Sequence, residues 1–483
     1  MGGVSELTMA APLSRAVLPV PPANLTSTWL PPRGEVGPPA VSPPELGRGY
    51  TEASSDGIPP LPSGHQSLTQ DLKSIRLVPS RHQCLRDIPL DTRTILQRHL
   101  NIEEKVRSNL LPWNGQFSPQ LVHAFLHTYS AANNVVLDPF MGSGTVLIEA
   151  ATMGLEAVGT EINPAAFLMA QIYLFTNMSP AVRNTSLETV HARLMELFEG
   201  APLFCPRPVL DDRACKRVLT AAWSSESNPN AKVLLAVLVT LLDFYKPGLT
   251  AAKILATWGR IRNCVDALAY SSAPLRIANA DARNLPLGTA SIDFVITSPP
   301  YINVFNYHQQ FRASTEALGW DLLHVAKSEI GSNRKNRGNR FLTVVQYCLE
   351  IGQVLEELFR VCKPDSRVIF VVGRESNVRK TRFFNGDIVA RLASRCTGFV
   401  PEVRQERVFM NRFGAPIYED ILHLRRGQAA SPISGGSMAV AIESLVEATR
   451  RVPAESAADL ASAIREAPSM RPSAIYKPQE VLR

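Results

Sequence analysis

The sequence lacks the patterns that mark secreted, membrane-spanning and thiolate zinc proteins. Its seven cysteines are scattered and odd in number, and none forms a Cys-x-x-Cys pair. This argues against a disulfide framework and a metal site, and for a reducing compartment. The longest strongly apolar stretch, Val233 to Leu242, is too short to span a bilayer, and the N-terminus has no basic start followed by an apolar core. We therefore expect a soluble cytoplasmic protein without a membrane partner.

Regular hydrophobic patterning is also scarce at both ends of the chain. Residues 1 to about 65 hold thirteen of the 37 prolines with Gly and Ser between them, and the chain from about 427 is rich in Ala, Ser and Pro. Such segments bury too little apolar surface to offset the entropy of ordering them. We predict a disordered Pro-rich segment over 1–85 and a flexible tail over 427–483.

What remains is globular in composition. The 483 residues are 45% apolar and 19% charged, with a net charge of +7. This length allows more than one domain, and the positive balance permits a polyanionic partner without requiring one.

A β-loop-α-β pattern opens the central part. Asn134–Asp138 reads as a short apolar strand that ends in an acid, and Pro139–Thr145 as a glycine-containing loop. A helix is expected from Val146 to Met153, and a second strand, Glu156–Glu161, again ends in an acid. This succession is typical of the first half of a doubly wound nucleotide-binding domain.

The loop lacks the signatures of phosphate binding. It has no Gly-Lys-Ser/Thr, and Leu147 stands where a dinucleotide-binding loop has its third glycine. Gly142 and Gly144 still allow a tight turn and a close approach of backbone to a ligand. Glu161 lies where such folds hold a ribose diol. These features favour a ligand with a ribose but no phosphate.

A second candidate site follows the apolar run Ile292–Ile296, which reads as a buried strand of a parallel sheet. The next five residues are Thr297-Ser298-Pro299-Pro300-Tyr301, and two prolines cannot continue a ladder. A stiff turn at the carboxyl end of a strand presents a hydroxyl, two carbonyls and an aromatic ring, groups that suit a nucleobase. The alternative is a plain strand-to-loop turn.

Together, Asp138-Pro139-Phe140-Met141-Gly142-Ser143-Gly144-Thr145 and the Thr297–Tyr301 turn resemble the S-adenosylmethionine-dependent amino-methyltransferases of DNA. The resemblance covers roughly 117 to 425. It implies an α/β fold, a doubly wound Rossmann-like class I methyltransferase sheet, with S-adenosyl-L-methionine as cofactor. It also implies double-stranded DNA as partner, with the target base flipped out, and makes a cognate restriction endonuclease a candidate partner.

The resemblance assigns roles to individual residues. The catalytic residues it implies are Ser298, Pro299, Pro300 and Tyr301. The cofactor-binding residues are Asp138, Phe140, Gly142, Gly144, Thr145, Glu161 and, after a third strand, Asp281. A basic run just past the turn is either a solvated face or a phosphate-gripping loop, and DNA contact is expected from Lys327, Arg334, Lys335, Arg337 and Arg340.

These assignments divide the chain between its two ends into three parts. Residues 86–171 form the cofactor-binding half of the methyltransferase domain, and 271–426 the catalytic half with the DNA-contacting loop. Residues 172–270 read as a helical insertion, either an all-α cover for the sheet or a DNA-recognition element.

The target base is less well defined than the fold. Ser298 at the head of the turn resembles the cytosine-N4 enzymes more than most adenine-N6 ones, so cytosine N4 is preferred. Adenine N6 methylation is the first alternative, and RNA base methylation and a non-catalytic DNA-binding scaffold follow. A dinucleotide oxidoreductase is disfavoured by the missing third glycine.

Overall fold

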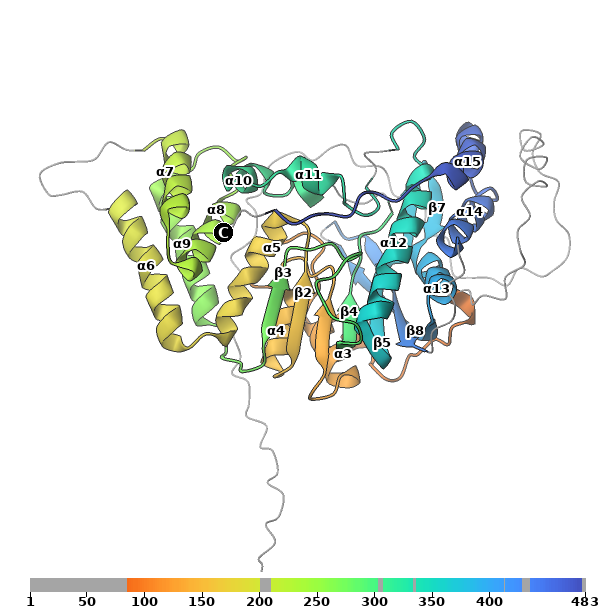
Figure 1. Ribbon diagram of the computed structural model, residues 1–483, viewed down its shortest axis with the longest axis horizontal. Coiled ribbons are helices and arrows are strands. Elements are labelled where there is room, and N and C mark those ends of the chain that lie inside the picture. Colours follow the sequence, from red (N-terminus) through yellow and green to blue (C-terminus); the bar gives the residue numbers. More distant parts are fainter. Residues whose placement is uncertain are drawn as a thin grey trace, which may run out of the picture. The chain divides into compact units, whose positions relative to one another are not determined.

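A seven-stranded sheet forms the centre of the protein (Figure 1). The computed structural model describes residues 85–199, 210–302, 307–332, 336–411, 413–427 and 435–479. The strand order across the sheet is β3 (Leu275–Ala278), β2 (Glu156–Thr160), β1 (Val135–Asp138), β4 (Ile292–Thr297), β5 (Cys362–Gly373), β9 (Pro416–Arg426) and β8 (Phe399–Met410). The first five are parallel, and β9 is antiparallel to both of its neighbours. The predicted class I methyltransferase sheet is therefore confirmed.

The direction of winding reverses between β1 and β4. From β1 the chain builds outward through β2 and β3, and then returns to add β4 and β5 on the other side. A crevice at the carboxyl ends of the strands is expected at such a reversal, and it is where open α/β sheets bind ligands. Leu137 pairs with Val295, so the end of β1 lies beside the end of β4.

Both faces of the sheet are covered by helices. Alternate residues of β5 (Val368, Phe370 and Val372) share one apolar core with α12 (Leu342–Val361) and α13 (Asn385–Cys396), as the two-residue period of a strand requires. On the opposite face, the rings of α3 (Pro119–Tyr129) contact His423 of β9. Helix α4 (Thr145–Thr152) packs against α3 and β2, and α5 (Pro164–Ala170) follows β2.

Short elements make the connections. They are the helices α2 (Gln97–Asn101), α10 (Arg312–Ala317) and α11 (Leu322–Ala326), the 3₁₀ turns η2 (Leu85–Asp87), η3 (Gln171–Asn177), η4 (Tyr307–Gln309) and η5 (Ala467–Ser469), and the hairpin strands β6 (Glu375–Val378) and β7 (Thr381–Phe384). In the described ranges, no helix combines the length and apolarity needed to cross a membrane.

Four helices occupy the segment between η3 and β3. They are α6 (Pro180–Phe198), α7 (Asp212–Ser225), α8 (Pro229–Leu242) and α9 (Ala251–Asp266), and their N-caps Ser179, Asp211, Asn228 and Thr250 each accept a backbone N–H. Helix α8 is the middle of the group, with every residue from Leu234 to Leu242 buried. The group packs on α5 and lies beside the β3 edge of the sheet (Figure 1).

The C-terminal part differs from the flexible tail predicted for 427–483. Within its described residues lie α14 (Gly436–Ala448) and α15 (Ala454–Glu466). Val440, Ala441, Leu445 and Ala448 are fully buried in the core that includes α12 and α13. Their spacing places them on one face of a helix, and the many small Ala and Ser residues concealed that amphipathic pattern. This prediction was wrong for the two helices, while the predicted N-terminal segment lies outside the described residues except for Leu85.

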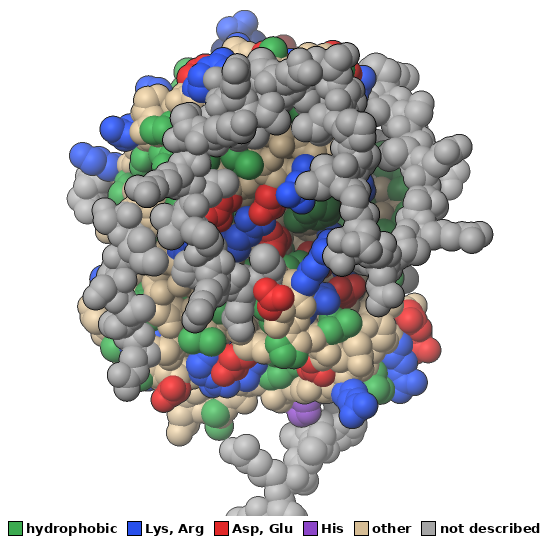
Figure 2. Space-filling view, turned by 90° about the vertical axis from the view of Figure 1, so that its right-hand side faces the viewer, with side chains coloured by type: hydrophobic (Ala, Val, Ile, Leu, Met, Phe, Trp, Pro, Cys, Tyr) green, Lys and Arg blue, Asp and Glu red, His purple; other side chains and the backbone are tan. Residues whose placement is uncertain are grey.

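The side of the molecule that carries these helices mixes charges of both signs (Figure 2). Arg379 and Lys380 of the β6–β7 hairpin pair with Asp459 and Glu455 of α15, at 3.0 and 3.4 Å. Exposed pairs of this kind contribute about 0–1 kcal/mol each. Apolar burial holds α14 in place, together with ion pairs that the buried Arg391 and Arg395 of α13 form with Glu447 and Glu443, both at 2.8 Å.

Replacing the fully buried Leu445 by Ala should therefore lower the free energy of unfolding by about 2–5 kcal/mol, because it leaves a cavity in a packed core. Urea denaturation would measure the change. Leu323→Ala is the matched control, since that side chain is 52% exposed and loses little burial. Equal stabilities for the two variants would show that α14 is not part of the core.

Candidate active site

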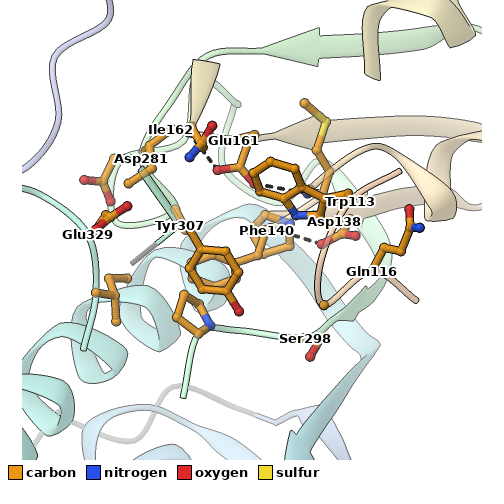
Figure 3. A pocket seen from close by; sticks show the side chains of 18 of the residues that line it. Trp113, Gln116, Asp138, Phe140, Glu161, Ile162, Asp281, Ser298, Tyr307 and Glu329 are labelled. Carbon is orange, nitrogen blue, oxygen red and sulfur yellow. Dashed lines mark hydrogen bonds between the residues drawn. The ribbon is translucent and has the colours of Figure 1, made fainter. Parts of the chain in front are cut away.

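A cavity opens at the carboxyl edge of the sheet, in the crevice between β1 and β4. Its empty volume is about 1030 Å³, a figure that includes open solvent at the mouth. Figure 3 shows the labelled side chains around it, from Asp281 and Glu329 at one end to Gln116 and Ser298 at the other. The two predicted motifs thus line one cavity. Nine of the eleven residues predicted for catalysis and cofactor binding line it: Asp138, Phe140, Gly142, Thr145, Glu161, Asp281, Ser298, Pro300 and Tyr301.

The backbone of the glycine loop makes the tight turn that its sequence predicted. Gly142 and Gly144 have φ of +50° and +91°, and a Cβ at Gly144 would lie 2.8 Å from the Tyr173 ring. The backbone N–H of Gly142 donates to Glu161 Oε2 at 3.1 Å, and that of Asn163 donates to Oε1 at 2.8 Å. Each carboxylate oxygen has two acceptor positions. One position on each oxygen of Glu161 therefore remains for a ligand such as a ribose diol.

Asp138 links the two motifs. It is 1% exposed, and its Oδ1 accepts the hydroxyl of Thr297 at 2.7 Å and the N–H of Phe140 at 3.0 Å. The first bond joins the end of β1 to the end of β4, one residue before Ser298. Asp138 therefore fixes the turn relative to the glycine loop.

The Ser298–Tyr301 turn is anchored on its far side by β5 and β9. The Tyr301 ring lies against Gly373, where an added Cβ would be 2.9 Å from the ring. The Tyr301 hydroxyl is 3.4 Å from both Ser298 Oγ and Glu419 Oε1. Glycine at 373 thus gives the ring its place, and the Tyr301 hydroxyl lies between Ser298 and the carboxyl group of Glu419.

Two aromatic residues at the cavity were not predicted as site residues. The rings of Trp113 and Tyr307 stack with centroids 6.3 Å apart, and both line the cavity. A Cβ at Gly142 would lie 3.2 Å from the Trp113 ring. Trp113 comes from a segment without periodic pattern, and its neighbours Asn114 and Gly115 gave only a turn signal. The cavity therefore has an aromatic wall that the motifs do not reveal.

A buried carboxylate–histidine pair was missed as well. Glu329 lines the cavity, and its Oε2 is 2.6 Å from Nδ1 of His308, which is fully buried. Its Oε1 accepts the backbone N–H of His308 at 2.8 Å. This pair joins η4 to the segment around Glu329.

Asp281 lines the cavity, but its acceptor positions are already filled. Oδ1 accepts the N–H and Nε of Arg283 at 3.0 and 2.9 Å, and Oδ2 accepts Arg283 Nη2 at 2.7 Å and the N–H of Tyr476 at 2.8 Å. Four bonds use the four positions of a carboxylate. A contact of Asp281 with an adenine amino group remains a prediction.

The basic run lies away from the cavity as far as the structure describes it. Lys327 and Arg337 are exposed and Arg340 is half-buried, and none of the three lines the cavity. Arg334 and Lys335 lie outside the described residues. DNA contact by these five side chains stays a prediction.

Burial changes the acidity of two cavity carboxyl groups. It raises the pKa of Asp138 to about 7, against the opposing hydrogen bond from Thr297. It also raises the pKa of Glu161 to about 7, against the hydrogen bonds from Asn163 and Gly142. Both groups therefore change charge close to neutral pH. In the described residues, no three His, Cys, Asp or Glu side chains are arranged to share a metal ion.

Comparisons with known proteins agree with the motifs over the first half of the site. Residues 69–171 match the family described as DNA methylase, N6_N4_Mtase. A Type II methyltransferase of Methanocaldococcus jannaschii, M.MjaII, is 41% identical over 63 residues, which are 13% of this chain and 12% of that protein's length. The match thus covers only a small part of either protein.

Solved structures are more distant. A SAM-dependent methyltransferase of Methanosarcina mazei has a TM-score of 0.30 and 13% identity, over 63% of this chain and 97% of that one. The rRNA methyltransferase AviRa of Streptomyces viridochromogenes has a TM-score of 0.27 and 11% identity, over 75% and 98%. At these scores the fold is established by this chain's own strand order. The sequence matches confirm the resemblance that the motifs indicated, and the chain is similar to the N6/N4 amino-methyltransferases of DNA.

Proposed function

We propose that this protein is a DNA methyltransferase that moves a methyl group from S-adenosylmethionine to an exocyclic base amine, cytosine N4 in preference to adenine N6. One observation carries the proposal. The buried Asp138–Thr297 hydrogen bond holds the glycine loop and the Ser298–Tyr301 turn at the wall of one cavity. A methyl donor on the first and an amine on the second would meet there.

Residues of this chain can hold the donor. The glycine loop would lie against it, and the free acceptor positions of Glu161 would take its ribose hydroxyls. Asp138, Phe140, Thr145 and Asp281 would shape the surrounding wall. When bound, S-adenosylmethionine supplies an electrophilic methyl group on a sulfonium.

The turn would activate the amine. The lone pair of an exocyclic amine is conjugated into the base ring and is a poor nucleophile. Ser298 Oγ and the Pro299 carbonyl oxygen would accept hydrogen bonds from the two N–H groups of the amine, and this frees the lone pair of the nitrogen. Pro300 would keep the turn stiff. Tyr301 would stack on the base. Because the proton can leave after transfer, no strong base is needed, and alignment of the reacting atoms supplies most of the acceleration.

The target base must leave the duplex to reach this cavity. The stacked Trp113 and Tyr307 line the same cavity as Ser298 and would add aromatic surface for a flipped base. The basic residues Lys327, Arg334, Lys335, Arg337 and Arg340 would contact the phosphates of double-stranded DNA. A cognate restriction endonuclease is the proposed protein partner.

Nucleoside mass spectrometry tests the proposal directly. The protein is incubated with S-adenosylmethionine and unmethylated duplex DNA, with bulk tRNA in parallel. We expect N4-methylcytosine in the DNA. N6-methyladenine would keep the mechanism and change the target base. Methylation of tRNA alone would contradict the proposal that DNA is the substrate. The absence of any methylated product would favour a non-catalytic scaffold.

Ser298→Ala should lower kcat by about tenfold to a hundredfold, because one hydrogen bond to the developing charge on nitrogen is lost. Affinity for S-adenosylhomocysteine should stay within about twofold, since Ser298 does not hold the donor. Ser291→Ala, at the other end of β4, is the matched control. Turnover equal to that of the control would remove Ser298 from the mechanism.

Affinity for S-adenosylhomocysteine should rise between pH 6 and pH 8. The pKa of Glu161 is raised to about 7 by burial, and ribose hydroxyls that donate to its oxygens favour the ionised form. Binding then lowers this pKa and releases a proton below pH 7. Calorimetry of the wild type and Glu161→Gln would show the pH dependence and its loss. An equally steep dependence in the variant would assign the titration to another group.

A further inference from the structure

The chain after α15 returns to the cofactor end of the site. Residues 470–479, here called the C-terminal strap, carry no helix or strand. In Figure 1 the dark-blue trace that leaves α15 passes over the top of α12 and of the sheet towards α10. Its contacts agree with this path, since the N–H of Ser473 donates to Glu350 of α12 and Gln479 Nε2 donates to the carbonyl of Asp321, which caps α11. The strap therefore crosses the carboxyl edge of the sheet.

Arg283 binds the strap to the cavity wall. Its guanidinium is fully buried and donates to the carbonyls of Ser473 and Ala474, each at 3.0 Å. It also donates to the carbonyl of Ser328 at 3.2 Å and forms two bonds with Asp281. One cation thus joins two chain segments to the acidic residue after β3. A buried charge with this many partners is costly to disturb.

Tyr476 makes two separate connections to the cofactor end. It is 2% exposed, and its N–H donates to Asp281 Oδ2 at 2.8 Å. Its hydroxyl donates to Asn279 Oδ1 at 2.7 Å, and Asn279 Nδ2 donates to the carbonyl of Glu161, also at 2.7 Å. Burial raises the pKa of the Tyr476 phenol to about 12, so the hydroxyl is a neutral donor at physiological pH. The first connection ends at the carboxylate of Asp281, after β3, and the second at the backbone carbonyl of Glu161, after β2.

We propose that the C-terminal strap supports the cofactor site from behind the cavity wall and that Tyr476 is a positioning residue for Glu161, acting through Asn279. The inference rests on the proposed function for the identity of the ligand. Asn279 holds the peptide from which the Glu161 carboxylate projects, so its orientation sets where ribose hydroxyls can be accepted. The strap lies outside the part of the chain, about 117 to 425, that carries the methyltransferase resemblance. None of its described residues lines the cavity, so it acts through its contacts with Asp281 and Asn279.

The coupling between strap and ligand is reciprocal. A group that orients a binding carboxylate is itself stabilised when the ligand binds. S-adenosylhomocysteine should therefore slow hydrogen exchange at the Tyr476 amide, which donates to Asp281. A strap that only covers the protein surface would show no such change.

Calorimetry with S-adenosylhomocysteine, on the full-length protein, tests the hydrogen-bond connection from Tyr476 through Asn279 to Glu161. Tyr476→Phe removes only the hydroxyl and should weaken binding about fivefold to tenfold, the effect of one hydrogen bond. The KM for S-adenosylmethionine should rise by the same factor, with kcat unchanged at saturation. Tyr270→Phe is the matched control, because that ring is 62% exposed. Unfolding midpoints in urea are recorded for every variant.

A double-mutant cycle separates positioning from general stability. Asn279→Ala removes the same hydrogen-bond connection between Tyr476 and Glu161. Adding Tyr476→Phe to that variant should therefore weaken binding no further. Additive losses, or a Tyr476→Phe variant that binds like the wild type, would overturn the inference. Wild-type binding without DNA methylation would overturn the proposed function and leave this test intact. A wild type that does not bind S-adenosylhomocysteine would overturn both.

Discussion

The site depends on a hydrogen bond between two neighbouring strands. Asp138 and Thr297 are the last residues of β1 and β4, the strands at which the winding reverses, and their side chains meet at 2.7 Å. Burial raises the pKa of Asp138, because the ionised carboxylate loses its hydration there. Everything that lines the cavity from the glycine loop or the proline turn is placed relative to this contact. The arrangement explains why two motifs 159 residues apart behave as one site.

Local sequence predicted the parts of the site that depend on local backbone. The glycines at positive φ, the acid after β2 and the proline turn after β4 each leave a signature within a few residues. The doubly wound sheet followed from the same signals, because few topologies remain once its β-α-β units are found. The resemblance to a known family rests on these residues too.

Other parts of the site come from packing over long distances and left no local signal. Trp113 reaches the cavity from an irregular segment, and Arg283 gains its role only because Ser328 and Ser473 lie beside it in space. The tail was mistaken for a flexible one because the buried faces of its helices are rich in Ala and Ser and hold few large apolar side chains. A helix whose buried face consists mostly of small residues has a sequence like that of a low-complexity segment. Its amphipathic character becomes visible only when the helix that it packs against is known.

The origin of the cavity residues bears on how the chain folds. The cavity wall and its support come from five distant stretches of sequence, represented by Trp113, Glu161, Asp281, Glu329 and, in contact with Asp281, Tyr476. The group α6–α9, between Glu161 and Asp281, is built instead from successive helices that pack on one another. Contacts between near neighbours in sequence form faster than those that close long loops. We therefore expect the helical group to form early in folding, and a ligand-binding signal to be among the last to recover during refolding.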